Sequence, residues 1–274
     1  MTADTDNDTE IYGLLDDLYG RFHYDFRQYA KASLRRRLAS AQARFNVRTT
    51  RDLRARLRAE PALLTSLLDF LTVQVSEMFR DPNYFFGLRS DVLPVLATYP
   101  QVRIWVPGCS AGEEAYSIAV LLKEEGLLER SFIYATDINP AALARARAGI
   151  FDTARMAQFT ANHRLSGARS SLSDHYHAAP GGALMDSSLR ERIMFSDHSL
   201  ATDSVFSEVQ LISCRNVLIY FDKPLQNRAL DLFNQSLCRR GWLGLGIKET
   251  LRFTSQADHF DEIRRDVKLY RRRQ

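Results

Sequence analysis

The stretch that decides the fold is Ile104-Trp-Val-Pro-Gly-Cys-Ser-Ala-Gly-Glu-Glu-Ala-Tyr-Ser117. An apolar run leads into a turn that contains Gly108 and Gly112, and an acidic amphipathic segment follows. A second apolar run, Phe132-Ile-Tyr-Ala-Thr136, ends on Asp137. A glycine turn after one strand lets the backbone approach a ligand, and an acid after the next strand can accept both hydroxyls of a ribose. Together they predict a pocket for a cofactor that contains adenosine.

The residues of the turn narrow the choice of cofactor. The chain has neither G-x-G-x-x-G nor G-x-x-x-x-G-K-[ST] here, so the dinucleotide motif and the P-loop are both missing. Glu113 and Glu114 stand where a pyrophosphate would need bare helix N–H groups. Carboxylates repel phosphate but suit a cation, such as the amino group and sulfonium of S-adenosylmethionine (SAM). The sequence therefore favours SAM over an ordinary strand–turn–helix without a ligand.

Length and composition describe an ordinary globular protein. The 274 residues are 45% hydrophobic and 26% charged, which allows one large domain or two modest ones. No apolar run approaches the ~20 residues that span a bilayer. The polar N-terminus does not resemble a signal peptide. Three cysteines without a C-x-x-C pair indicate reduced thiols, so we expect a cytoplasmic protein.

Charge is distributed unevenly over the first sixty residues. Residues 1–20 hold six acids and no base, whereas residues 21–60 hold twelve Lys or Arg and three acids. This local positive excess predicts docking of an acidic partner, and the alternative is a solvated helix face. Exposed aromatic residues are not interleaved with the basic ones, which argues against a nucleic acid.

Hydrophobic spacing divides the chain into two parts. From Ile11 to about Phe86 apolar residues recur at three- and four-residue spacing, which predicts an all-α N-terminal domain with a buried helix over residues 63–75. From Gln101 onward apolar strands alternate with helices, which predicts a parallel sheet covered on both faces. A helix is also predicted over residues 256–263. Ligands of such a sheet bind at the carboxyl ends of its strands.

Residues 150–192 interrupt this alternation. They are rich in Ser, His, Gly and Ala, so we expect a long functional loop or a small subdomain. The segment contains His163, His175 and His177. These histidines lack acids or cysteines at ligand spacing, so no metal site is predicted and their role is left open.

Two further segments place polar residues near the same sheet edge. Arg80 lies at the junction of the two parts, where a cation can orient a carboxylate. The alternative for Arg80 is a local ion pair with Asp81. Asn216 and Tyr220 follow an apolar strand, and an aromatic ring close to a sulfonium methyl group is favourable. The alternative for Tyr220 is a buried structural role.

These segments resemble the CheR family, the chemoreceptor glutamate methyltransferases of bacterial chemotaxis. The resemblance covers nearly the whole chain and rests on Phe79-Arg80, Gly108–Ser117, Ala135–Asn139 and Cys214–Asp222. It implies an α/β fold, with a Rossmann-like class I SAM-dependent methyltransferase sheet. The implied parts are an all-α N-terminal domain with a linker helix over residues 10–88, a SAM-binding domain over residues 89–274, and an inserted antiparallel β-subdomain for receptor docking over residues 150–192.

The resemblance also implies roles for single residues. Arg80 would lie beside the methyl-transfer centre, and Tyr220 would guide the methyl group. Asp137 would bind the ribose, and Glu113 the amino group of the methionine part. The remaining implied cofactor contacts are Gln74, Ser76, Arg80, Gly108, Ser199, Leu200, Asn216 and Val217. The chain departs from the common family pattern at Gln74 and Ser76, at Ser199, and at Gly246-Ile-Lys-Glu249, where Gly-His-Ser-Glu is frequent.

The implied reaction is direct attack of a receptor glutamate carboxylate on the methyl group of SAM. A carboxylate with a pKa of about 4.3 is ionised at neutral pH, so the enzyme needs to supply position and water exclusion and no general base. The implied partner is the cytoplasmic helical bundle of a chemoreceptor, met by the basic helices of residues 27–58 and possibly by residues 150–192. The enzyme would be a monomer that reaches the membrane only through its receptor. Two alternatives remain, a methyltransferase for another protein or a small molecule and a non-catalytic SAM-binding regulator.

Overall fold

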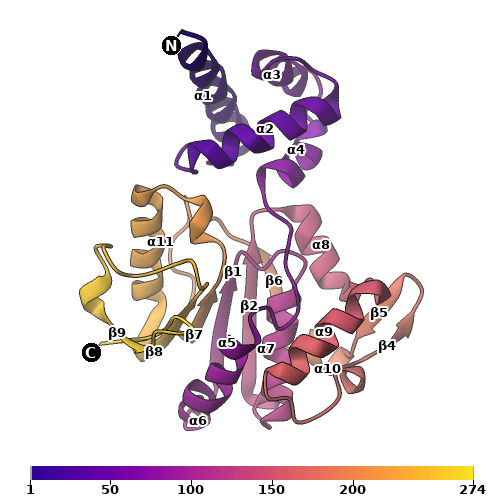
Figure 1. Cartoon of the computed structure of the whole chain (residues 1–274), viewed down its shortest axis with the longest axis vertical. Helices are drawn as coiled ribbons and strands as arrows, with labels where there is room; N and C mark the ends of the chain where they lie inside the picture. Colours follow the sequence, from indigo (N-terminus) through magenta and orange to yellow (C-terminus); the bar gives the residue numbers. More distant parts are fainter. Residues whose placement is uncertain (1, 274) are drawn as a thin grey trace.

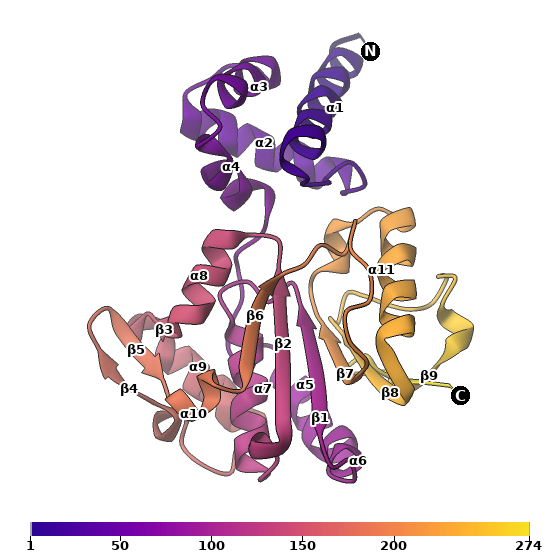
Figure 2. The ribbon, with the colours of Figure 1, turned by 180° about the vertical axis from the view of Figure 1, so that it is seen from behind.

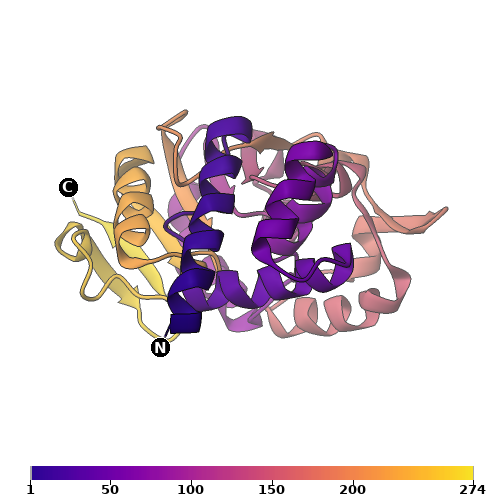
Figure 3. The same ribbon diagram turned by 90° about the horizontal axis from the view of Figure 1, so that it is seen from above.

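The computed structural model describes the backbone of residues 2–273 and the side chains of residues 8–273. A helical N-terminal part sits above a mixed α/β part (Figure 1). Its helices are α1 (Thr2–Phe22), α2 (Lys31–Phe45), α3 (Thr50–Ala59) and α4 (Leu63–Leu71). Their inward apolar residues, among them Leu14, Leu38 and Leu68, form a separate hydrophobic core. Seen from above, these helices lie over the α/β part (Figure 3).

The buried helix expected over residues 63–75 ends earlier, at Leu71. Thr72 already has extended backbone angles, φ −99° and ψ 148°, and its hydroxyl donates to the carbonyl of Leu68 at 2.7 Å. Thr72, Val73 and Val75 are β-branched, which disfavours continuation of a helix. The helical spacing of apolar residues therefore extends further along the sequence than the helix itself, which ends at Leu71. Residues 72–81 form an irregular linker.

The linker leads into a continuous helical segment of α5 (Pro82–Gly87), a π-helical turn (Leu88–Val92) and α6 (Leu93–Leu96). Asp81 precedes it with φ +55°, and Pro82 occupies the first turn, where its missing N–H costs no hydrogen bond. Pro94 lies just after the π-turn. A proline inside a helix removes one donor, which accounts for the wider turn at this point.

A seven-stranded sheet forms the centre of the α/β part, in the order β6-β2-β1-β7-β8-β10-β9. The first five strands of this order run parallel, whereas β10 and β9 are antiparallel additions at one edge. The strands are β1 (Val102–Pro107), β2 (Ser131–Asp137), β6 (Ile193–Asp197), β7 (Val209–Cys214), β8 (Leu237–Leu245), β9 (Phe260–Arg264) and β10 (Leu269–Arg272).

The helix expected over residues 256–263 is wrong. Only Ala257–His259 form a single 3-10 turn, and Phe260–Arg264 is strand β9, paired with β10. Phe260 and Ile263 have the three-residue spacing of a helix, but only Phe260 is buried, and Ile263 is 45% exposed. Backbone pairing with the edge of the sheet therefore outweighed the helical spacing of two apolar residues.

The sheet separates two apolar clusters because neighbouring residues of a strand point to opposite faces. Ile104 and Val106 pack on one face with residues of α7 (Glu113–Glu124) and α8 (Pro140–Ala148). Trp105 points to the other face, where its ring meets Phe233 of α11 (Lys223–Ser236) at 5.4 Å between centroids. Both faces are thus covered, which leaves the carboxyl edge of the parallel strands for a ligand.

The segment of residues 150–192 is largely ordered structure. It contains β3 (Ile150–Phe151), α9 (Thr153–Leu165), a 3-10 turn (Leu172–His175), β4 (Tyr176–Ala179), β5 (Gly182–Met185) and α10 (Ser187–Arg190). The three strands form an antiparallel sheet in the order β3-β5-β4, at the far side of the molecule from α11 (Figure 2). Gly182 is required in it, because a Cβ there would lie 2.2 Å from the carbonyl oxygen of Phe151. Helix α9 was not expected from the sequence.

Two histidines of this insert have structural partners. His163 on α9 is fully buried, and its Nε2 lies 3.1 Å from Oε1 of Glu124 at the end of α7. His175 lies beside it, with Nε2 2.9 Å from the hydroxyl of Ser170. Glu124 also pairs with Arg89. The cluster fastens the insert to α7, whereas His177 is exposed on β4.

Candidate functional site

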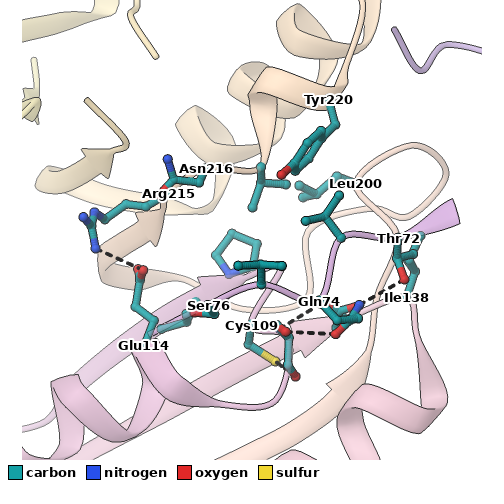
Figure 4. Close-up of a pocket in the computed structure, with 18 of the residues that line it drawn as sticks. Thr72, Gln74, Ser76, Cys109, Glu114, Ile138, Leu200, Arg215, Asn216 and Tyr220 are labelled. Carbon is teal, nitrogen blue, oxygen red and sulfur yellow. Dashed lines mark hydrogen bonds and ion pairs between the residues drawn. The ribbon is translucent and has the colours of Figure 1, made fainter. Parts of the chain in front are cut away.

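A cavity lies at the carboxyl ends of β1, β2, β6 and β7 (Figure 4). Its empty volume is about 920 Å³, counting the open solvent at its mouth. Three parts of the chain line it: the ends of these strands, the linker of residues 72–80, and the N-terminal helical part. Of the site residues predicted from the sequence, all but Glu113 and Ser199 line the cavity.

The turn after β1 forms the floor of the cavity. Gly108 has φ +68°, and a Cβ there would lie 2.5 Å from a methyl carbon of Val217. Both the backbone angle and the close approach therefore require glycine. Gly112, with φ +94°, then starts helix α7. Gly108, Cys109 and Ser110 of this turn line the cavity.

Asp137 ends β2 and faces the same cavity, with only 8% of its surface exposed. Its Oδ2 accepts a hydrogen bond from the N–H of Ser110 at 2.9 Å, and Oδ1 accepts one from the N–H of Asn139 at 2.9 Å. A carboxylate has about four acceptor sites, so each oxygen retains capacity for another donor. Burial raises the pKa of Asp137, and these two N–H groups oppose that effect.

The linker supplies the residues opposite the turn. The side-chain oxygen of Gln74 accepts from the hydroxyl of Ser110 at 2.8 Å, and its amide donates to the hydroxyl of Thr72 at 3.0 Å (Figure 4). Ser76 and Arg80 also line the cavity. No hydrogen bond or ion pair joins the Arg80 guanidinium to another described residue. The alternative of a local pair with Asp81 is not formed, since Asp81 pairs with Arg215 at 2.7 Å.

The two glutamates at the start of α7 lie in different surroundings. Glu114 lines the cavity, and its carboxylate accepts from the Ser213 hydroxyl at 2.5 Å and from Arg215 at 3.2 Å. Glu113 lies outside the cavity wall, is 1% exposed, and pairs through Oε1 with Arg155 of α9 at 3.0 Å. Its Oε2 is buried without a partner. The adjacent pair of acids was the only sequence signal for Glu114, and the signal did not distinguish one acid from the other.

The segment after β6 shows a similar shift by one position. Leu200 lines the cavity, whereas Ser199 does not, and the N–H of Ser199 donates to Asp203 at 2.8 Å. His198 lines it instead, with its ring edge-on to Trp105 at 5.2 Å between centroids. His198, and not the predicted Ser199, therefore forms this part of the cavity wall.

The loop after β7 brings Asn216, Val217 and Tyr220 to the cavity. Asn216 has φ +60°, a conformation that is uncommon outside glycine. Tyr220 lies in a short 3-10 turn (Leu218–Tyr220), and its ring faces the guanidinium of Arg37 at 4.5 Å. Tyr220 is therefore part of a cation–π contact, and it also borders the ligand space.

Arg37 is a cavity residue that the sequence did not reveal. It comes from α2, is 6% exposed, and donates through Nη1 to the carbonyl of Leu71. Its Nε and Nη2 are buried without partners. Burial lowers the pKa of Arg37, and the nearby Tyr220 opposes that shift. Since Arg37 stands in an Arg-Arg-Arg run, the sequence placed it on the surface.

The helical part is joined to this loop through the backbone. The N–H of Ala30 donates to the carbonyl of Tyr220 at 2.9 Å, and the N–H of Asp222 donates to the carbonyl of Gln28 at 2.9 Å. The rings of Tyr29 and Phe221 meet edge to face at 5.0 Å. These contacts place α2 over the cavity.

The positive charge of residues 21–60 is partly neutralised inside the helical part. Acids of α1 pair with arginines of α2 and α3, as between Arg35 and Asp8 at 2.8 Å and between Arg54 and Asp17 at 2.8 Å. Within residues 8–273, no ion pair joins an acid to Arg36, Arg44 or Arg48, all of which are exposed. The basic surface is therefore smaller than the sequence suggested, and it is concentrated on and just after α2.

The described part of the chain lacks both a metal site and a membrane-spanning helix. No group of three or more His, Cys, Asp or Glu residues has the arrangement of a metal site. None of the described helices combines the length and apolarity that crossing a bilayer requires.

Family models match almost all of the chain. Residues 74–269 match the SAM binding domain of CheR methyltransferases, and residues 9–72 match their all-alpha domain. A Pseudomonas putida protein that carries the methyltransferase name Cher3 is 50% identical over 272 residues, which are 99% of this chain and 100% of that protein. The chemotaxis protein methyltransferase of Listeria monocytogenes is 31% identical over 83% of this chain and 84% of that protein. That of Vibrio parahaemolyticus is 30% identical over 96% of both chains.

Proposed function

Because the chain belongs to the CheR methyltransferase family and uses SAM as its cofactor, we propose that it methylates glutamate side chains of chemoreceptors, giving glutamate methyl esters. The observation that carries the choice of a carboxylate substrate is the pair of guanidinium groups at the cavity. Among the described residues, the Arg80 guanidinium has no hydrogen-bond or ion-pair partner, and Arg37 has two buried nitrogens, Nε and Nη2, without acceptors. Guanidinium donors bind carboxylates in bidentate geometry, so the cavity is suited to an acidic side chain.

The residues at the cavity fit the cofactor. We propose that Asp137 accepts the ribose hydroxyls through its remaining lone pairs, since its two known partners leave that capacity free. The turn at Gly108 brings the backbone close to the ligand, and Gln74, Ser76, Leu200, Asn216 and Val217 form the surrounding wall. For the amino group we retain Glu113, because its Oε2 is a buried acceptor without a donor.

Methyl transfer to a carboxylate requires the protein mainly to position the two reactants. SAM supplies an electrophilic methyl group on its sulfonium, and the oxygen of a glutamate carboxylate forms the new bond as the sulfur–carbon bond breaks. The carboxylate is ionised at neutral pH, so no base is required. Arg80 and Arg37 orient the carboxylate, and Tyr220, which also lines the cavity, guides the methyl group. The helical part over the cavity limits access of water.

A labelling experiment tests this proposal. The protein is incubated with receptor-bearing membranes and SAM that carries a labelled methyl group, and the receptor band is treated with base. Label on the receptor that base releases as methanol supports glutamate methyl esters. Base-stable label, label on another protein or on a small molecule, or binding of S-adenosylhomocysteine (SAH) without any transfer would contradict it.

We also propose that the exposed arginines of α2 dock the acidic surface of the receptor. Lowering salt from 0.1 M to 0.01 M lengthens the Debye length from about 10 Å to about 30 Å. We therefore expect added salt to weaken receptor affinity much more than SAH affinity. The double variant Arg36→Glu with Arg44→Glu should weaken receptor affinity at low salt, because repulsion replaces attraction. Sedimentation of the protein with receptor membranes measures this affinity.

The matched control reverses the same number of charges elsewhere. Arg103 and Arg239 are exposed near the amino ends of β1 and β8, at the opposite edge of the sheet from the cavity. The double variant Arg103→Glu with Arg239→Glu should keep normal receptor affinity. Equal losses in both double variants would show that only net charge matters, and normal methylation by the first would assign docking to residues 150–192.

A further inference from the structure

Glu249 holds the loop after β7, which lines the cavity. It lies in the turn after β8, is 5% exposed, and does not line the cavity. Its Oε2 accepts from the N–H groups of Gly246 at 2.6 Å and Asn216 at 3.0 Å. Its Oε1 accepts from Val217 at 2.9 Å and Ile219 at 3.3 Å. Four backbone donors thus fill the acceptor sites of one carboxylate.

The loop needs this partner because its own conformation is unfavourable. Asn216 has φ +60°, and such a residue persists only when its surroundings hold it in place. The N-terminal part holds the far end of the loop, at Tyr220 and Asp222, through two backbone hydrogen bonds. Glu249 holds the end that enters the cavity, at Asn216 and Val217.

Gly246 allows this arrangement to be compact. A Cβ at Gly246 would lie 2.7 Å from Oε2 of Glu249 and 2.9 Å from the backbone nitrogen of Asn216. The end of β8 can therefore approach the loop only with glycine at this position. Burial raises the pKa of Glu249, and the backbone donors oppose the rise, as expected for a carboxylate whose charge they share.

We propose that Glu249 is a positioning residue of the methyltransferase site, which acts on SAM binding and methyl transfer by holding Asn216, Val217 and Tyr220 in place. The proposal rests on the assignment of the cavity to SAM under the proposed function. The Glu249 carboxylate contacts neither ligand nor substrate, so it acts on them only through the backbone of the loop.

Glu249→Gln is the direct test, because glutamine has the same shape but one acceptor oxygen. Its amide group would face two of the four N–H donors and repel them. We expect the Kd of SAH to rise about tenfold and kcat to fall at least about tenfold, since several hydrogen bonds to a charged group are lost. The KM for receptor should stay within about twofold. Calorimetry gives the Kd, and steady-state methylation gives kcat and KM.

Glu124→Gln is the matched control. Glu124 is also a buried carboxylate with several partners, but it lies at the opposite end of α7 from the cavity. The Glu124→Gln variant should therefore have a lower Tm and an unchanged Kd of SAH. Gly246→Ala is the second variant, which keeps the carboxylate and displaces it, and it should reproduce the loss of SAH affinity. If Glu249→Gln does not fold, Gly246→Ala provides the test in its place.

The results separate positioning from general stability. A rise in Kd beyond that of Glu124→Gln at an equal fall in Tm supports the proposal. SAH affinity and kcat within about twofold of wild type in a folded variant would overturn it, as would losses that merely follow Tm. Since SAH binding does not depend on the methyl acceptor, a wild-type protein that binds SAH but does not methylate receptors contradicts the glutamate substrate and leaves this test intact.

Discussion

Replacing Arg80 by alanine is expected to lower kcat/KM for methyl transfer by at least about thirtyfold, with little change in Tm. Removing one partner from a desolvated charge pair costs about 2–5 kcal/mol, and the lower value corresponds to roughly thirtyfold. Tm should hold because the Arg80 guanidinium has no partner among the described residues to lose. Steady-state methylation of receptor membranes and thermal unfolding measure the two quantities.

Arg37→Ala should give a comparable loss of turnover but a lower Tm, because Arg37 also donates to Leu71 and packs on Tyr220. The control is Arg36→Ala, which removes the neighbouring guanidinium of α2 from an exposed position outside the cavity. It should leave kcat unchanged. Normal turnover by both Arg80→Ala and Arg37→Ala would remove the guanidinium pair from the site, and with it the argument for a carboxylate substrate.

Replacing Asp137 by alanine is expected to weaken SAH binding by about ten- to a hundredfold. Loss of hydrogen bonds to a charged group costs about 1.5–3 kcal/mol, and the variant also frees the N–H groups of Ser110 and Asn139. Calorimetry measures the change. The control is Asp197→Ala, because Asp197 pairs with Asp137 in the register of β2 and β6 but does not line the cavity. Equal affinities in wild type and Asp137→Ala would refute the ribose contact.

The pH dependence of SAH binding tests the same contact independently. Burial raises the pKa of Asp137 and so disfavours its ionised form. Ribose hydroxyl donors favour that ionised form, so binding lowers the pKa of Asp137 and is favoured by high pH. Affinity should therefore fall as pH is lowered, and Asp137→Ala should show a weaker dependence. A pH profile identical to that of wild type would assign the titration to another group.

Part of this protein was predictable because local sequence patterns decide local structure. The apolar runs of β1 and β2 are buried on both faces, and no other element suits such runs at that length. Gly108 and Asp137 follow these strands directly, and parallel strands bring their carboxyl ends to one edge. That topology alone brings Asp137 and Gly108 together, so the cofactor could be inferred without any knowledge of packing.

Other features depended on tertiary contacts that no local pattern records. Whether residues 260–264 form a strand was decided by the edge of β10. Glu113 and Glu114 are adjacent in sequence, but the helix turns them about 100° apart, so packing chose which one met the cavity. The sequence determined the parallel strands of the sheet, its carboxyl-edge site and its cofactor, but not its antiparallel edge. Only the tertiary structure decided that Arg37 is buried at the cavity and not exposed with the other arginines of α2. The physical reason is that the burial of Arg37 depends on how the all-α part packs against the α/β part.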